Sequence, residues 1–256
     1  MRQGVRAVAG DGDPGFELCF LDADGDERRE LPAAWPGLRP ETFMPVREFR
    51  WARGQKHLPG LWWSATTGSH VGYESWLERP VDHVMLLDFD PQVTMLVAQP
   101  FWLRWRDDAG RSRRHAPDLF ARMADGSGVV IDVRPDDRVE DKDAEAFDVT
   151  KDACGLAGWG FRRVGVPDPV LAANVAWLAR YRHPRCGGSP DLGRLLQEIF
   201  AEPAPLMAGA AAAGDPMAVL PALFHLMWRH ALAADLAVRL TAEALVVAGT
   251  APGGAR

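Results

Sequence analysis

The chain of 256 residues is 47% apolar and 25% charged, which is the balance of an ordinary globular protein. It is long enough to bury a proper core, so folding requires neither a disulfide framework nor a structural metal. Its net charge of −6 argues against tight, independent binding to duplex DNA, because such proteins usually carry a basic excess. A nuclease that a partner brings to DNA is not excluded.

Cysteine usage and hydropathy bear on the compartment. Cys19, Cys154 and Cys186 form no CxxC or Cys/His cluster, so we expect no zinc site and a reducing, cytoplasmic environment. The N-terminal MRQGVRAVAGDGDPG lacks the apolar stretch of a secretory signal. The apolar runs near the C-terminus are broken by charge and are too short to span a bilayer, so no membrane is expected as a partner.

The first half of the chain is expected to begin with a strand over 16–22, followed by a proline-rich, irregular stretch over 31–45. Residues 46–63 interleave basic side chains with tryptophans. Such a stretch suits either phosphate and base contacts or a solvated loop whose tryptophans are buried at its ends. A helix that contains Glu74 and Glu78 is expected next.

The middle of the chain predicts a mixed α/β layer. A strand over 93–106 bends at its proline, and a hairpin with the tight turn ADGSG follows over 112–135. A helix over 141–159 ends at glycines, and it is followed by a strand over 161–166 and a helix over 170–182. This order of elements places a connecting helix between two neighbouring strands.

The composition changes near residue 186. A helix is expected over 190–202, a flexible Ala/Gly/Pro-rich linker over 203–216, and a small helical unit after it that can end in a strand. The sequence therefore predicts three parts, which are an N-terminal extension over 1–60, an α/β domain over 61–185 and a small, mainly helical C-terminal module over 186–256.

The hairpin RRHAPDLFARMADGSGVVIDVRP carries the chemistry. Side chains two residues apart on a strand share a face, so Asp132 and Arg134 point the same way. Asp118 ends the neighbouring strand, where its carboxylate can approach that of Asp132. Two close carboxylates repel each other unless a cation lies between them, and Mg²⁺ prefers such oxygen ligands. The alternative is a pair of solvated aspartates at a hairpin end, although Asp132 lies inside the apolar strand VVIDV.

A third acid would complete a metal site. Glu74 and Glu78 are four residues apart on the expected helix, so either can face the same cleft, and the alternative is a solvated helix face. The bound cation would activate a water molecule and stabilise the extra charge on phosphorus. His115 precedes the Pro-Asp step and is a candidate contact for phosphate, although such histidines are more often simply exposed.

This pattern resembles that of the PD-(D/E)xK nuclease superfamily, with APDLF and IDVRP at the positions of its two motifs. Over about residues 45–185 the chain resembles the TnsA-like endonuclease subunit of heteromeric transposases, through the runs GLWWSATTG, ESWLER, LLDFDPQVTMLVAQPFWLRW and PVLAANVAWLARYR. The resemblance implies a restriction-endonuclease-like mixed sheet flanked by helices in a nuclease domain over 61–185. It also implies hydrolysis of DNA that depends on Mg²⁺ or Mn²⁺.

The resemblance implies roles for single residues. The family's Ser-x-x-Glu motif falls on Ser75–Glu78, which favours Glu78 over Glu74 as the first metal ligand. The other implied ligands are Asp118 and Asp132, and Arg134 falls where the family has its catalytic lysine. Gln99 stands in a Gln-Pro step that matches a strand motif of the family, and Glu74 and His115 are candidate supporting residues by their positions in the sequence.

Arginine in place of the family's lysine is the main departure. A guanidinium stays protonated, so Arg134 can orient water and stabilise charge but cannot accept a proton. Lys142 and Lys151 on the next helix are candidates for a displaced lysine. If the departure disables the site, the chain is a catalytically silent subunit that binds DNA and partners.

The resemblance also implies partners. The family acts with a TnsB-like DDE transposase and a TnsC-like ATPase, and it cuts at the 5′ ends of a mobile element. Its C-terminal part is a small winged-helix-like module, for which residues 190–248 are the candidate. The arginines Arg111, Arg113 and Arg114 form the expected DNA-facing edge. A stand-alone nuclease of a defence system is a further alternative.

Overall fold

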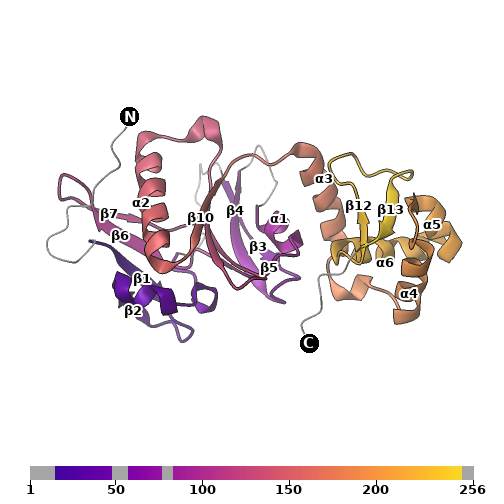
Figure 1. Ribbon diagram of the computed structural model, residues 1–256, viewed down its shortest axis with the longest axis horizontal. Coiled ribbons are helices and arrows are strands. Elements are labelled where there is room, and N and C mark those ends of the chain that lie inside the picture. Colours follow the sequence, from indigo (N-terminus) through magenta and orange to yellow (C-terminus); the bar gives the residue numbers. More distant parts are fainter. Residues whose placement is uncertain (1–14, 48–56, 77–82, 250–256) are drawn as a thin grey trace. The chain divides into compact units, whose positions relative to one another are not determined.

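The computed structural model describes residues 15–47, 57–76 and 83–249 (Figure 1). The chain forms two compact units. The first unit comprises residues 1–62, 70–77 and 92–166, and the second comprises residues 63–69, 78–91 and 167–256. Both contain helices and sheets, so the mixed α/β class predicted from the sequence is confirmed.

The first unit begins with an antiparallel sheet. Its strands are β1 (Glu17–Leu21), β2 (Glu27–Glu30), β6 (Trp102–Arg106) and β7 (Ser112–His115), in the order β2-β1-β6-β7. Alternation places Leu18, Phe20 and Leu103 on one face, which is buried against the core. The strand predicted over 16–22 is confirmed, and the proline-rich stretch after it forms the 3₁₀ helices η1 (Pro32–Gly37) and η2 (Pro40–Thr42).

A second sheet contains the later part of the predicted hairpin, whereas residues 112–115 at its start belong to β7 of the first sheet. Its strands are β5 (Val93–Ala98), β8 (Leu119–Met123), β9 (Gly128–Val133) and β10 (Gly160–Val164), in the order β10-β9-β8-β5. The β5–β8 and β8–β9 pairs are antiparallel, whereas β9 and β10 are parallel. A parallel pair requires a long crossover, and α2 (Asp141–Ala157) provides it.

Helix α2 covers the core of the first unit and lies beside β10 in Figure 1. A capping box of Glu140 and Asp143 satisfies its first amides, and Gly158 ends it in the left-handed conformation, with φ of 72°. Its apolar face contributes Val149 and Ala153 to a cluster around the fully buried Trp35. The helix predicted over 141–159 is therefore confirmed.

The helix predicted around Glu74 is wrong. Residues His70–Trp76 form strand β4, which pairs with β3 (His57–Trp63). Val71 is buried, and the aromatic and β-branched residues of this segment favour a strand that has a partner to pair with. Glu78 lies outside the described residues, and the following helix, α1 (His83–Phe89), begins beyond it.

The turn between β3 and β4 explains why the strand forms. The carboxylate of Asp88 in α1 accepts hydrogen bonds from Ser64 Oγ at 2.6 Å and from the backbone amides of Ala65 and Thr66 at 3.1 and 2.9 Å. Asp88 is buried, so these bonds replace the water that its charge would otherwise bind. The turn is held by a side chain that is distant in sequence, and periodicity alone does not reveal such a contact.

The second unit contains α1 and most of the C-terminal elements. Its further helices are α3 (Pro169–Leu178), α4 (Pro190–Ile199), α5 (Leu206–Ala213) and α6 (Pro216–Trp228), with short 3₁₀ turns η4 (Ala179–Tyr181) and η5 (Pro184–Cys186). Its sheet has the strands β11 (Ala204–Pro205), β12 (Leu232–Ala234) and β13 (Leu245–Ala248), in the order β11-β13-β12. The terminal strand predicted as an option is present.

The flexible linker predicted over 203–216 is wrong, because this segment forms β11 and α5. Alanine has the strongest intrinsic helix propensity, and Leu206 and Ala210 are buried against neighbouring helices. Among the described residues, no single helix is long and apolar enough to cross a membrane. The helices α5 and α6 reach the required length and composition only as a pair bent by 119°.

A buried ion pair ties η2 to β8. Both carboxylate oxygens of Glu41 accept from the guanidinium of Arg122, at 2.7 and 3.1 Å, and the Glu41 side chain is only 2% exposed. Burial alone would raise the pKa of Glu41, but the hydrogen bonds and charge of Arg122 outweigh burial and lower this pKa below its ordinary value.

Glu41→Gln should therefore make the stability of the protein less sensitive to acid. A depressed pKa in the folded state stabilises the protein above the unfolded-state pKa of about 4.3, and this contribution is lost as the pH falls through the folded-state pKa. The variant should lose about 1–2 kcal/mol at pH 7 and differ little from the wild type at strongly acid pH. Urea unfolding across this range tests it, with the exposed Asp108→Asn as control. Plots of unfolding free energy against pH that run parallel for the wild type and Glu41→Gln would contradict this prediction.

Asn174 on α3 fastens the loop before β13. Its Nδ2 donates to the carbonyls of Leu236 and Val238 at 2.9 and 2.7 Å, and its Oδ1 accepts from the amide of Leu240 at 3.0 Å. The side chain is 5% exposed, so water replaces these bonds poorly.

Asn174→Ala should lower the free energy of unfolding by about 3 kcal/mol, because three backbone groups lose their partner. It should also make the loop over 236–240 more sensitive to limited proteolysis. Thermal unfolding and proteolysis measure both effects, and Gln197→Ala on the exposed face of α4 is the control. Wild-type stability together with an unchanged cleavage pattern would refute this assignment.

Candidate functional site

The end of the β8–β9 hairpin brings Asp118 and Asp132 together. The register pairs Leu119 with Ile131, so the two aspartates face each other one step further on. Asp132 Oδ1 accepts from the amide of Asp118 at 3.2 Å, and Asp118 Oδ2 accepts from the amide of Val133 at 2.8 Å. Each carboxylate is thus bonded to backbone beside the other acid, and the sequence correctly placed them next to each other.

Asp132 is a buried charge with a specific partner. Its residue is 1% exposed, and His115 Nε2 lies 3.0 and 2.9 Å from its two carboxylate oxygens. Because an ionised carboxylate can only accept, Nε2 is the donor in this contact. His115 comes from β7 in the first sheet, so this bond joins that sheet to the β10-β9-β8-β5 sheet.

The pKa of His115 reflects this partnership. Burial alone lowers it, but the hydrogen bond to Asp132 and the negative charges of Asp132, Asp118 and Asp143 together raise the pKa above its ordinary value. The imidazolium form is favoured as a result, and it neutralises part of the negative charge that the two aspartates bring together. The histidine that we considered an exposed side chain is thus a partly buried one, with 23% of its side chain exposed.

Cys154 on α2 lies in the apolar core of the first unit. It is 3% exposed, and burial, with a smaller contribution from the charge of Asp132, raises its pKa to about 12. A thiol with so high a pKa is a poor nucleophile and a poor metal ligand at neutral pH. The interpretation of Cys154 as a small core residue is consistent with this burial.

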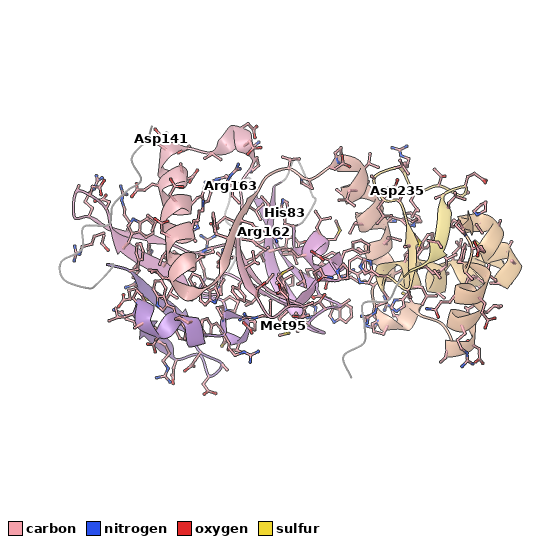
Figure 2. The ribbon with its side chains drawn as sticks, viewed as in Figure 1. His83, Met95, Asp141, Arg162, Arg163 and Asp235 are labelled. Carbon is pink, nitrogen blue, oxygen red and sulfur yellow. The ribbon has the colours of Figure 1, made fainter. Side chains whose placement is uncertain are left out.

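Arg134 contacts α2. Its Nη2 donates to Asp143 Oδ1 of α2 at 2.9 Å, and 30% of its side chain is exposed. Its carbonyl accepts from Arg163, which is labelled in Figure 2 and also pairs with Asp136, in the 3₁₀ turn η3 (Asp136–Arg138), at 2.5 Å. The cation predicted to meet phosphate is therefore already paired with a carboxylate.

Lys142 and Lys151 stay candidates for the displaced catalytic lysine. Lys151 is exposed on α2, and the side chain of Lys142 lies outside the described part of the structure. Neither residue is brought to Asp132 by a described contact.

Gln99 is the most unusual residue near the two acids. It is 1% exposed, and its φ of 44° lies in the left-handed region that residues other than glycine rarely adopt. Its amide donates to the carbonyl of Asp118 at 2.9 Å, and its carbonyl accepts from the amide of Val46 at 2.9 Å. Its side-chain oxygen, Oε1, has no hydrogen-bond partner within the described residues.

The three arginines predicted to face DNA differ in their partners. Arg111 and Arg113 both pair with Asp107, at 2.8 and 3.0 Å. Arg114 instead lies over the ring of Trp102, 4.4 Å from its centroid. Two of the three charges are thus locally compensated.

The predicted third acid is not placed. Glu74 belongs to β4 but its side chain is not described, and Glu78 falls in the gap between β4 and α1. Within the described ranges, no group of three or more His, Cys, Asp or Glu side chains is arranged to hold a metal ion. The described contacts bring together Asp118 and Asp132, and Gln99, whose amide donates to the carbonyl of Asp118, has an unpaired Oε1. These hard oxygen atoms fit Mg²⁺ or Mn²⁺ in chemical type.

Sequence reasoning missed the His115–Asp132 pair and the strained backbone of Gln99. A signal for the pair was present, because an acid inside the apolar strand VVIDV needs a buried donor, and a histidine lies just before the Pro-Asp step of the hairpin. No pattern in the sequence indicated the conformation of Gln99. Comparison of the chain with protein-family models and with curated proteins finds no match.

The His115–Asp132 pair should be strongly coupled. His115→Leu should lower the free energy of unfolding by about 3 kcal/mol at pH 7, because it leaves the Asp132 carboxylate buried without its cation. Adding Asp132→Asn should recover part of this loss, since the unpaired charge disappears. Urea unfolding of both single variants and the double variant, in EDTA, measures the coupling. Additive effects of the two substitutions would show that the contact contributes nothing.

Proposed function

We propose that the chain is a metal-dependent DNA endonuclease of the PD-(D/E)xK type, acting as the TnsA-like subunit of a heteromeric transposase. The observation that carries the proposal is the juxtaposition of Asp118 and Asp132 at one end of the β8–β9 hairpin. A soluble fold rarely buries an acid beside a second acid without a cationic or catalytic reason.

The order of elements supports the proposal. Strands β5, β8 and β9 are antiparallel neighbours, and α2 then leads to β10 parallel to β9. We infer a restriction-endonuclease-like core from this mixed sheet and its crossover helix, as the resemblance in the sequence implies. In the second unit, the order α4, β11, α5, α6, β12, β13 with a three-stranded sheet supports our proposal of a winged-helix-like module.

In the proposed site, Asp118 and Asp132 hold Mg²⁺ or Mn²⁺ together with Glu78. The cation, when bound, supplies an activated water and neutralises charge on the scissile phosphate. Arg134 keeps its positive charge at any working pH, so its role is to stabilise phosphate and not to take a proton. When DNA binds, Arg134 would leave Asp143 and donate to a phosphate oxygen. The guanidinium would thereby exchange one charge-assisted hydrogen bond for another.

The acidic protein needs help to reach DNA. Arg114 offers a cation and Trp102 an aromatic ring on the outer face of the first sheet, and Arg111 and Arg113 add weaker attraction because Asp107 compensates them. A TnsB-like transposase and a TnsC-like ATPase, in the same cytoplasm, are the proposed partners that supply the rest of the DNA affinity.

A catalytically silent subunit is the second candidate. The observation that favours it is that the cationic side chains near the acids already have partners. His115 is hydrogen-bonded to the carboxylate oxygens of Asp132, and Arg134 donates to Asp143. Such a subunit would bind DNA ends and partners without cutting, and its acids would serve only to hold the two sheets together.

Plasmid nicking with Mg²⁺ or Mn²⁺ separates the two candidates. For an endonuclease, Asp118→Ala should reduce nicking on the order of a hundredfold, because a metal ligand is lost. Arg134→Lys should keep most of the activity and Arg134→Ala should lose it, since a positive charge is what the site requires. Asp148→Ala on the exposed face of α2 is the matched control and should nick like the wild type.

The assay is run with the chain alone and with its proposed partners. Absence of metal-dependent nicking in both settings, with a folded wild-type protein, would refute the endonuclease and support the silent subunit. Nicking that survives Asp118→Ala would assign the activity to another site or to a contaminant.

A further inference from the structure

We propose that the amide oxygen of Gln99 is an additional oxygen donor for the divalent cation, beside Asp118 and Asp132. The inference rests on the proposed metal-dependent function and names a ligand beyond the acids of that site. Three independent features of Gln99 lead to it, which are its backbone conformation, its unpaired oxygen and its position in the sheet.

The backbone of Gln99 is held in an unfavourable conformation. Its φ of 44° brings Cβ close to the neighbouring carbonyl, and glycine would adopt this conformation without strain. Gln99 and His230 are the two residues other than glycine with positive φ in the described part of the chain. Such strain persists where the surroundings impose it, and it concentrates at ligand sites.

Within the described part of the chain, the side-chain oxygen of Gln99 makes no hydrogen bond that would offset this strain. Oε1 of Gln99 accepts no hydrogen bond from the described residues although the residue is 1% exposed. Buried polar atoms nearly always have a partner, and the exceptions are enriched where a ligand, ion or water completes the set. A glutamine with a structural role would direct this oxygen to a backbone amide, as Asn174 does.

The position of Gln99 completes a row across the sheet. The register pairs Ala98 with Leu119 and Leu119 with Ile131. At the next step, Gln99 just after β5, Asp118 just before β8 and Asp132 on β9 are neighbours. Neighbouring strands lie about 4.8 Å apart, which places three oxygen-bearing side chains at the same end of three strands. The bond from the Gln99 amide to the Asp118 carbonyl, at 2.9 Å, fixes the first two side by side.

A neutral donor suits this position. A third carboxylate beside Asp118 and Asp132 would add to their mutual repulsion before the cation binds. An amide oxygen is a hard ligand without charge, and Mg²⁺ and Mn²⁺ accept such oxygen atoms directly or through a bound water. Glutamine therefore adds a ligand without increasing the charge that His115 has to balance.

The test measures Mn²⁺ binding to the full chain without DNA, by electron paramagnetic resonance, and thermal stability in EDTA. Gln99→Met keeps the length of the side chain but removes its oxygen. It should weaken Mn²⁺ binding by about tenfold. Its stability in EDTA should equal or exceed that of the wild type, because an unpaired buried acceptor is removed. Gln197→Met on α4 is the matched control and should change neither value.

Gln99→Glu provides the opposite substitution. It should bind Mn²⁺ at least as tightly as the wild type, because a carboxylate replaces the amide oxygen, and it should be less stable in EDTA because it adds a negative charge to the row. A combined loss of Mn²⁺ affinity and metal-free stability in Gln99→Met would overturn the inference in favour of a structural role.

Asp118→Ala separates the ligand role of Gln99 from the proposed metal-dependent function. If it weakens Mn²⁺ binding while Gln99→Met binds like the wild type, the ligand role of Gln99 is wrong and the proposed function stands. If the wild type and Asp118→Ala bind Mn²⁺ equally, the metal site at the two aspartates is absent, and both proposals fail together.

Discussion

The buried carboxylate of Asp132 is the constraint on which the first unit depends. A charge that is 1% exposed must be balanced by nearby donors, because the solvation that it loses is worth several kcal/mol. His115 from β7 and the amide of Asp118 at the start of β8 provide those donors. Only two residues separate His115 from Asp118, so the chain passes from the first sheet to the second at the point where this carboxylate takes partners from both.

The charge of Asp132 that His115 offsets is also the charge that the proposed metal site would use. Imidazolium at His115 and a divalent cation would serve one electrostatic purpose, which is to offset the charges of Asp118 and Asp132. The pairing of Arg134 with Asp143 extends this balance along the face of the sheet that α2 covers. His115 and Arg134 thus each offset one acidic side chain.

Buried polar side chains organise the second unit in a similar way. Asp88 holds the turn between β3 and β4, and Asn174 holds the loop before β13, each through three hydrogen bonds. In both cases one side chain on a helix fixes a segment that is distant in sequence. A loop held in this way keeps its conformation without a large apolar contact of its own.

The sequence by itself determined the elements whose signals are local. Alternation and the ADGSG turn predicted the hairpin, helical spacing and the glycines that follow it predicted α2, and antiparallel pairing then placed Asp118 beside Asp132. Tertiary structure decided the rest. Glu74 lies in a strand because β3 pairs with it, His115 meets Asp132 because two sheets converge, and the conformation of Gln99 depends on its neighbours. These features arise from contacts between residues far apart in the chain, which periodicity and propensity do not encode.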